Sequence, residues 1–111
     1  MKLAFASALT ASALIFAGVL HADDTPTFDI IIKDHKFAPA TLEIPANKKV
    51  KLIVKNQDPT PEEFESYELN REKVIPGNSQ AIIFVGPLDP GTYPFFGEFN
   101  QKTAQGKIIA K

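Results

Sequence analysis

Hydrophobic residues recur at every second position in several short segments of the chain. The clearest example is KVKLIVKN, in which Val50, Leu52 and Val54 alternate with lysine and other residues. A period of two is typical of a strand with one buried face. Similar runs are FDIII, TLEIP, EKVI, AIIFV, YPFF and GKIIAK. Pro-Gly or Gly-Pro turn signals separate EKVI, AIIFV and YPFF from one another. Short strands arriving about every eight to twelve residues between such turns predict an all-β sandwich.

The segment QDPTPEEFESYEL has a different local pattern. Thr60 is a favourable N-cap, Pro61 is a favourable first helical residue, and Glu63 would complete a capping box. We therefore predict a short helical insertion near residues 60–67, between two strands. Glu62 and Glu63 would then complement the N-terminus of that helix, which is the simplest interpretation of Glu62.

The N-terminal segment has the features of an export signal. Lys2 precedes a stretch of apolar and small residues, and the sequence turns polar after Ala22. This pattern predicts a signal peptide over residues 1–22 and a single domain over residues 23–111. The alternative is a retained N-terminal anchor, although no stop-transfer charges follow. Cleavage would leave no membrane span and would place the protein outside the cytoplasm, most simply in a bacterial periplasm.

Composition excludes several classes of function. The chain contains no cysteine, so no disulfide supports the small core. Its 12 basic and 13 acidic residues are nearly balanced, which argues against nucleic-acid binding, because that function favours a concentrated basic face. No nucleophile constellation and no phosphate-binding glycine loop is present, so the sequence predicts neither hydrolytic nor nucleotide-dependent chemistry.

Several segments taken in order resemble the cupredoxins. They are FAP, TLEIPANKKVKLIVKN, LDPGTYPFF and the final GKII, and together they span nearly all of residues 23–111. The segment NQDPTPEEFESYELNREKVIPG more specifically resembles the EfeO-type cupredoxin-like domains of periplasmic ferrous-iron uptake systems. This resemblance implies a Greek-key β-sandwich that binds copper or iron in support of iron uptake. It also implies a periplasmic iron-binding protein or an iron permease as partner.

The chain departs from the blue-copper pattern at the ligand positions. In TYPFFGEFNQKTAQG, Gly97 takes the position of the cysteine and Asn100 that of the histidine, and the only methionine is Met1. A type 1 copper centre needs a thiolate and two imidazoles. We therefore predict no type 1 copper and no electron shuttling of the plastocyanin kind.

Oxygen ligands remain at that end of the predicted sandwich. The cupredoxin topology implies that three loops meet there, and they carry our candidate metal ligands Glu63, Glu65, Glu98 and His35. Carboxylates with a single imidazole suit Fe(III), Mn(II) or Cu(II). For His35 and Glu98, simple exposure to solvent is the competing interpretation.

Three functional hypotheses follow from these observations. The first is a periplasmic metal-binding protein that supports ferrous-iron uptake, binding iron or helping to oxidise it, with or without copper. The second is a non-redox interaction module that docks on a permease or a periplasmic binding protein. The third is a copper carrier that uses His35 together with carboxylates. Whether the protein is an enzyme, such as a ferroxidase-type accessory, stays open at this point.

Overall fold

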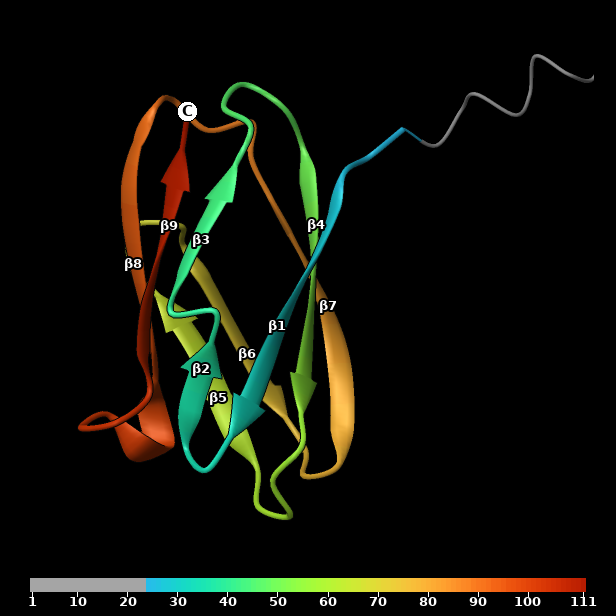
Figure 1. Ribbon diagram of the computed structural model, residues 1–111, viewed down its shortest axis with the longest axis vertical. Helices are drawn as coiled ribbons and strands as arrows, with labels where there is room; N and C mark the ends of the chain where they lie inside the picture. Colours follow the sequence, from blue (N-terminus) through green and yellow to red (C-terminus); the bar gives the residue numbers. More distant parts are fainter. Residues whose placement is uncertain (1–23) are drawn as a thin grey trace, which may run out of the picture.

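A computed structural model describes residues 24–111 as two β-sheets packed face to face (Figure 1). The strands are β1 (Thr27–Lys33), β2 (Lys36–Ala38), β3 (Thr41–Ile44), β4 (Val50–Asn56), β5 (Glu62–Ser66), β6 (Arg71–Ile75), β7 (Ser79–Val85), β8 (Gly91–Gly97) and β9 (Gln105–Ala110). A single turn of 3-10 helix, η2 (Glu98–Asn100), follows β8. The predicted all-β sandwich is confirmed. The predicted signal peptide lies outside the described residues.

The two sheets differ in size and in strand order. One has four strands in the order β2-β1-β4-β7, and the other has five in the order β3-β9-β8-β5-β6. Strands β1 and β4 are parallel, as are β3 and β9, and the remaining pairs are antiparallel. This order places β5 between β6 and β8 in the five-stranded sheet. Phe64 and Glu65 of β5 therefore have paired neighbours on both sides.

The core lies between the sheets and is built by the alternation seen in the sequence. Val50, Leu52 and Val54 are fully buried on β4, while the residues between them point outward. Phe37, Phe64 and Phe95 form an aromatic cluster, in which the ring of Phe95 lies 4.9 Å from that of Phe37 and 5.0 Å from that of Phe64. Such contacts contribute beyond their buried area, which suits a small domain without disulfides.

The predicted helical insertion near residues 60–67 is wrong, because Glu62–Ser66 forms strand β5. Glu62, Phe64 and Ser66 are buried and the two residues between them are not, so the segment has the period of a strand. Phe64 packs in the aromatic cluster and β5 pairs with β6 and β8. Burial and pairing on both sides outweigh a local capping signal, whose contribution is only about 1 kcal/mol.

Within residues 24–111, no helix has the length and apolar character needed to cross a membrane.

Candidate metal centre

Strand β5 places two of the predicted ligands side by side on the outer face of the five-stranded sheet. Since successive side chains of a strand point to opposite faces, the burial of Phe64 directs Glu63 and Glu65 outward. The neighbouring strand β6 runs antiparallel to β5, with Glu72 directly opposite Glu65. Residues that face each other in this way have Cβ atoms about 5 Å apart. The hairpin therefore concentrates three carboxylates in one place.

The three carboxylates can approach a common cation. One oxygen each from Glu63, Glu65 and Glu72 lies within 4.8 Å of the other two. Glu63 and Glu65 are half-buried and Glu72 is exposed. The three ion pairs found among residues 24–111 do not involve these carboxylates. We call Glu63, Glu65 and Glu72 the acidic cluster.

Hydrogen bonding, burial and like charge together raise two pKa values in the acidic cluster. The pKa of Glu63 is raised to about 7, chiefly by a hydrogen bond with the Glu72 carboxyl group and then by burial and by the charges of Glu72, Glu65 and Glu98. The pKa of Glu65 is also raised, first by burial and then by the charges of Glu72 and Glu98. Both shifts favour the protonated form of Glu63 and Glu65 in the metal-free protein. A bound cation would favour the ionised form instead.

Glu98 lies next to the acidic cluster. It is the first residue of η2, directly after the end of β8, and Gly97 at that end pairs with Phe64 of β5. Its charge contributes to the raised pKa of both Glu63 and Glu65. Glu98 is outside the group of oxygens within 4.8 Å, so it approaches the three carboxylates without joining them.

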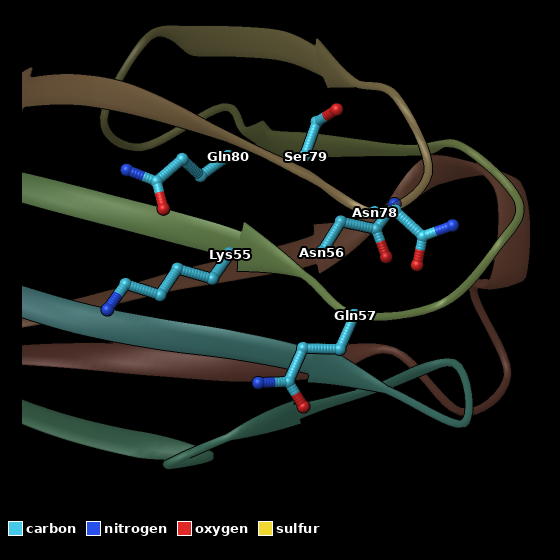
Figure 2. Close-up of a pocket in the computed structure, with 6 residues that line it drawn as sticks. All are labelled: Lys55, Asn56, Gln57, Asn78, Ser79 and Gln80. Atoms are coloured by element: carbon cyan, nitrogen blue, oxygen red, sulfur yellow. The ribbon is translucent and has the colours of Figure 1, made fainter.

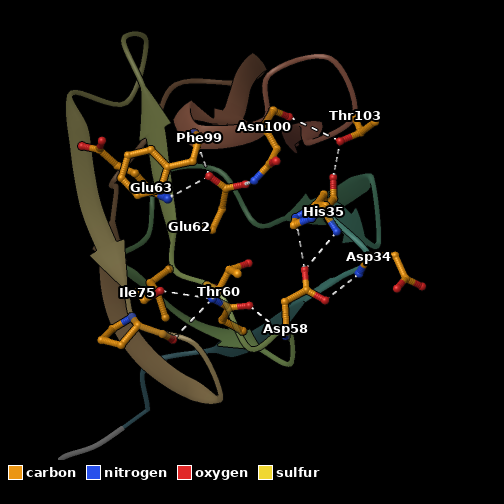
Figure 3. A network of polar contacts seen from close by, with 12 residues as sticks. Asp34, His35, Asp58, Thr60, Glu62, Glu63, Ile75, Phe99, Asn100 and Thr103 are labelled. Atoms are coloured by element: carbon orange, nitrogen blue, oxygen red, sulfur yellow. Dashed lines mark hydrogen bonds and ion pairs between the residues drawn. The ribbon is translucent and has the colours of Figure 1, made fainter.

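The structure places His35 in a different group. His35 lies in the turn between β1 and β2, where its Nδ1 is 3.6 Å from Oδ2 of Asp58. The backbone N–H groups of Asp34 and His35 donate to the Asp58 carboxylate at 2.8 and 2.9 Å, and the His35 N–H is the main cause of the lowered pKa of Asp58. Figure 3 shows His35 and Glu63 on opposite sides of the Glu62 carboxylate. The structure therefore brings Glu63 and Glu65 together, with Glu98 nearby, and sets His35 apart.

Two residues that matter here were missed in the sequence. Glu72 joins the acidic cluster only because β5 and β6 form a hairpin, and the helix predicted for 60–67 concealed that pairing. Glu62 was assigned to a helix N-terminus, but its side chain is among the largest that are fully buried. Its carboxylate accepts hydrogen bonds from three groups that belong to Glu63, Phe99 and Asn100. The alternation Glu62, Phe64, Ser66 was the available signal for both.

A polar depression that is separate from the acidic cluster has no carboxylate in its lining. It has a volume of about 420 Å³ at the adjoining ends of β4 and β7. Its lining residues are Lys55, Asn56, Gln57, Asn78, Ser79 and Gln80 (Figure 2). The Asn56 amide already donates to the carbonyl groups of Thr60 and Ile75. Amide and lysine side chains alone are a poor set of ligands for a metal ion.

Comparison with known proteins agrees with this architecture. The family model described as a cupredoxin-like domain matches residues 4–110. A relative from Rickettsia prowazekii (strain Madrid E), "Uncharacterized protein RP394", is 51% identical over 80 residues, which cover 72% of this chain and 64% of that protein. The matched part thus spans less than two thirds of that relative.

Solved structures of low sequence identity share the fold. Auracyanin A, a "blue" copper protein from Chloroflexus aurantiacus, aligns with a TM-score of 0.69 and 14% identity over 79% of this chain and 100% of its own. The metal-binding domain of the Cu(I)-exporting P-type ATPase CopA of Streptococcus pneumoniae D39 aligns with a TM-score of 0.65 and 16% identity over 77% and 84%. These likenesses confirm the predicted cupredoxin-like sandwich. The absence of cysteine from the sequence is consistent with the predicted lack of a type 1 copper site.

Proposed function

Since the chain belongs to the cupredoxin-like domain family, we propose that it binds a metal cation through Glu63, Glu65 and Glu72, with Glu98 as an additional ligand. The observation that supports this proposal is the approach of three carboxylate oxygens to within 4.8 Å on the face of a pleated sheet. The pKa of Glu63 is raised chiefly by its hydrogen bond with Glu72 and by burial, and the nearby like charges add to the shift. A cation relieves the repulsion between these charges.

The ligand atoms favour a hard or borderline ion. Carboxylate oxygens suit Mn(II), Fe(III) and Cu(II), whereas Cu(I) prefers sulfur. The sequence has no cysteine and its only methionine is Met1. We therefore propose iron as the physiological cargo and treat Mn(II) and Cu(II) as useful probes.

The proposed role is to support ferrous-iron uptake in the periplasm. This role rests on the resemblance of the segment around Glu63 and Glu65 to EfeO-type domains, and the proposed partner is a periplasmic iron-binding protein or an iron permease. Because Glu98 borders the acidic cluster and His35 does not, the geometry favours an oxygen-ligand site over a copper carrier centred on His35.

Thermal unfolding with and without metal tests the proposal. A ligand present at about 100 times its Kd stabilises the folded state by about 2.7 kcal/mol, which raises the Tm of a domain this size by roughly 10–20 °C. We expect such a rise with at least one of Fe(III), Mn(II) and Cu(II) in the wild-type protein. Glu65→Gln should abolish most of it.

A matched control separates the site from general charge effects. Glu43 lies on β3, the opposite edge of the same sheet, and its one ion pair within residues 24–111 is an exposed contact with Lys111. Glu43→Gln removes the same charge and should retain the metal-dependent rise in Tm. Equal Tm values with and without all three metals would refute the metal site and favour the interaction-module hypothesis.

A further inference from the structure

Glu62 joins the two segments that carry the proposed ligands. Its Oε1 atom accepts hydrogen bonds from the backbone N–H of Glu63 and from the backbone N–H of Phe99, both at 2.9 Å. Its Oε2 atom accepts a hydrogen bond from Nδ2 of Asn100 at 2.8 Å (Figure 3). The side chain is 1% exposed. One buried carboxylate thus binds β5 and η2 at the same time.

The end of β8 is shaped to accept this carboxylate. A Cβ atom at Gly97 would lie 2.6 Å from Cδ and 2.7 Å from Oε2 of Glu62. Glycine is therefore the only residue that leaves room for the carboxylate beside the backbone. By resemblance, Gly97 and Asn100 stand where a blue-copper protein has its cysteine and a histidine. In this chain the corresponding space holds Glu62 and its hydrogen-bond donors.

Glu62 also replaces a missing helix cap. The N-cap of η2 is Gly97, which has no side chain to accept a hydrogen bond, and Phe99 is the second residue of that turn. An N-cap side chain normally accepts from the N–H of the second or third helical residue. Glu62 accepts that N–H from a neighbouring strand. The orientation of η2, and of Glu98 at its start, therefore depends on Glu62.

We infer that Glu62 is a positioning residue for the metal site: it does not bind the ion, but it holds η2, which begins with Glu98, against β5, which carries Glu63. This inference rests on the proposed metal-binding function. The two backbone N–H groups that Oε1 accepts belong to Glu63 itself and to the residue after Glu98. Loss of the carboxylate releases the link between the two segments, while the acidic cluster on the β5–β6 hairpin remains.

Two substitutions distinguish positioning from simple support of the fold. Glu62→Leu removes both acceptor oxygens, and it should weaken Mn(II) binding about 10- to 100-fold, the usual effect of losing a residue that orients a metal ligand. Glu62→Gln keeps one oxygen for both N–H groups, and Asn100 can turn its amide to accept from the new NH₂ group. This variant should bind Mn(II) within a few-fold of wild type. Mn(II) affinity is measured by loss of the free-ion electron paramagnetic resonance signal, with folding verified by circular dichroism.

A double-mutant cycle tests whether the effect passes through Glu98. In a Glu98→Gln background, the further change Glu62→Leu should have little effect on Mn(II) affinity, because the ligand that Glu62 positions is already gone. Amide hydrogen exchange supplies a readout without metal: the Phe99 N–H should be protected in wild type and Glu62→Gln and should exchange rapidly in Glu62→Leu. Glu62→Met, with an unbranched side chain of similar length, replaces Glu62→Leu if that variant does not fold.

The outcomes separate the two proposals. If the wild-type protein binds none of the metals, the proposed function fails, and this inference fails with it. If the wild type binds Mn(II) and folded Glu62→Leu or Glu62→Met binds it equally well, the proposed function stands and the positioning role of Glu62 is overturned. A full effect of Glu62→Leu in the Glu98→Gln background would overturn it as well.

Discussion

Replacing Gly97 by alanine adds a single methyl group where the structure has no room for one. The added Cβ would lie 2.6–2.7 Å from the Cδ and Oε2 atoms of Glu62 and 2.7 Å from Cβ of Ala104. Ordinary contacts between such atoms begin at about 3.4 Å or more. The Ala104 atom is attached directly to the backbone, so the contact with it is relieved only by a backbone shift, while the Glu62 carboxylate can move by several tenths of an ångström.

That displacement has two energetic consequences. Overpacking a filled interior typically destabilises a protein by about 1–3 kcal/mol. Moving the carboxylate also disturbs its hydrogen bonds with Phe99 and Asn100, and a hydrogen bond to a charged group contributes about 1.5–3 kcal/mol. We expect a loss of about 3 kcal/mol in the free energy of unfolding, which corresponds to a decrease in Tm of roughly 15 °C for a domain of this size.

Chemical and thermal denaturation of Gly97→Ala measure this loss, and the same strand supplies a control. Gly91 begins β8, and a Cβ there would meet only the Tyr93 ring and a carbonyl oxygen at 3.7–3.9 Å, which is ordinary contact. Gly91→Ala should change stability by no more than about 1 kcal/mol. Combining Gly97→Ala with Glu62→Ala should be less destabilising than the sum of the single changes, because one of the two obstructing groups is gone and only the contact with Ala104 remains. If Gly97→Ala unfolds at the same temperature as Gly91→Ala, the proposed packing around Glu62 is incorrect.

Two further predictions concern protonation and colour. Folding raises the pKa of Glu63 from 4.5 to about 7, chiefly through the hydrogen bond with Glu72, so between these pH values the folded state holds a proton that the unfolded chain has released. The free energy of unfolding of the metal-free protein should therefore fall as the pH rises from about 4.5 to about 7. A Tm that depends on pH as strongly in Glu72→Gln as in wild type would contradict this assignment. Addition of Cu(II) should give only weak absorption, because no thiolate is available for an intense charge-transfer band; a strong blue colour in the visible spectrum would show that the ligand assignment is incorrect.

Much of the fold could be predicted from the alternation of apolar residues. The segment KVKLIVKN became β4 with the expected face buried, and TLEIP became β3. Local patterns do not specify strand order or register, because these depend on contacts between residues far apart in the chain. The parallel pairing of β3 with β9 joins Leu42 to Ile108, for example, and neither segment contains a signal for the other.

The error at residues 60–67 had a consequence for the site. Thr60, Pro61 and Glu63 form a good helix start, so the local signal was genuine, but the strand positions of Phe64 and its neighbours decided the outcome. A strand puts alternate residues on one face, whereas a helix would have separated Glu63 from Glu65 by about 200° around its axis. The prediction that both residues share a site is therefore compatible only with the strand. It followed from the family resemblance and not from the helix assigned to the segment.

The burial of Glu62 shows why changes at ligand positions have to be interpreted together. The resemblance to blue-copper proteins places Gly97 where those proteins have a cysteine. Since protein interiors are close-packed, a glycine at such a position leaves a volume that another group has to fill. The group that fills it beside Gly97 is a carboxylate, which needs donors when it is buried. Asn100, which by the same resemblance stands at the position of a histidine, supplies one donor, and the N–H of Phe99 supplies another. Taken singly, Gly97 and Asn100 each look like the loss of a metal ligand. Together with Glu62 they are complementary: Gly97 leaves the space, Glu62 supplies the acceptor and Asn100 supplies a donor. A glutamate side chain is exposed in most proteins. The signals that this one is buried were its place in the alternation Glu62, Phe64, Ser66 and the volume left free at Gly97.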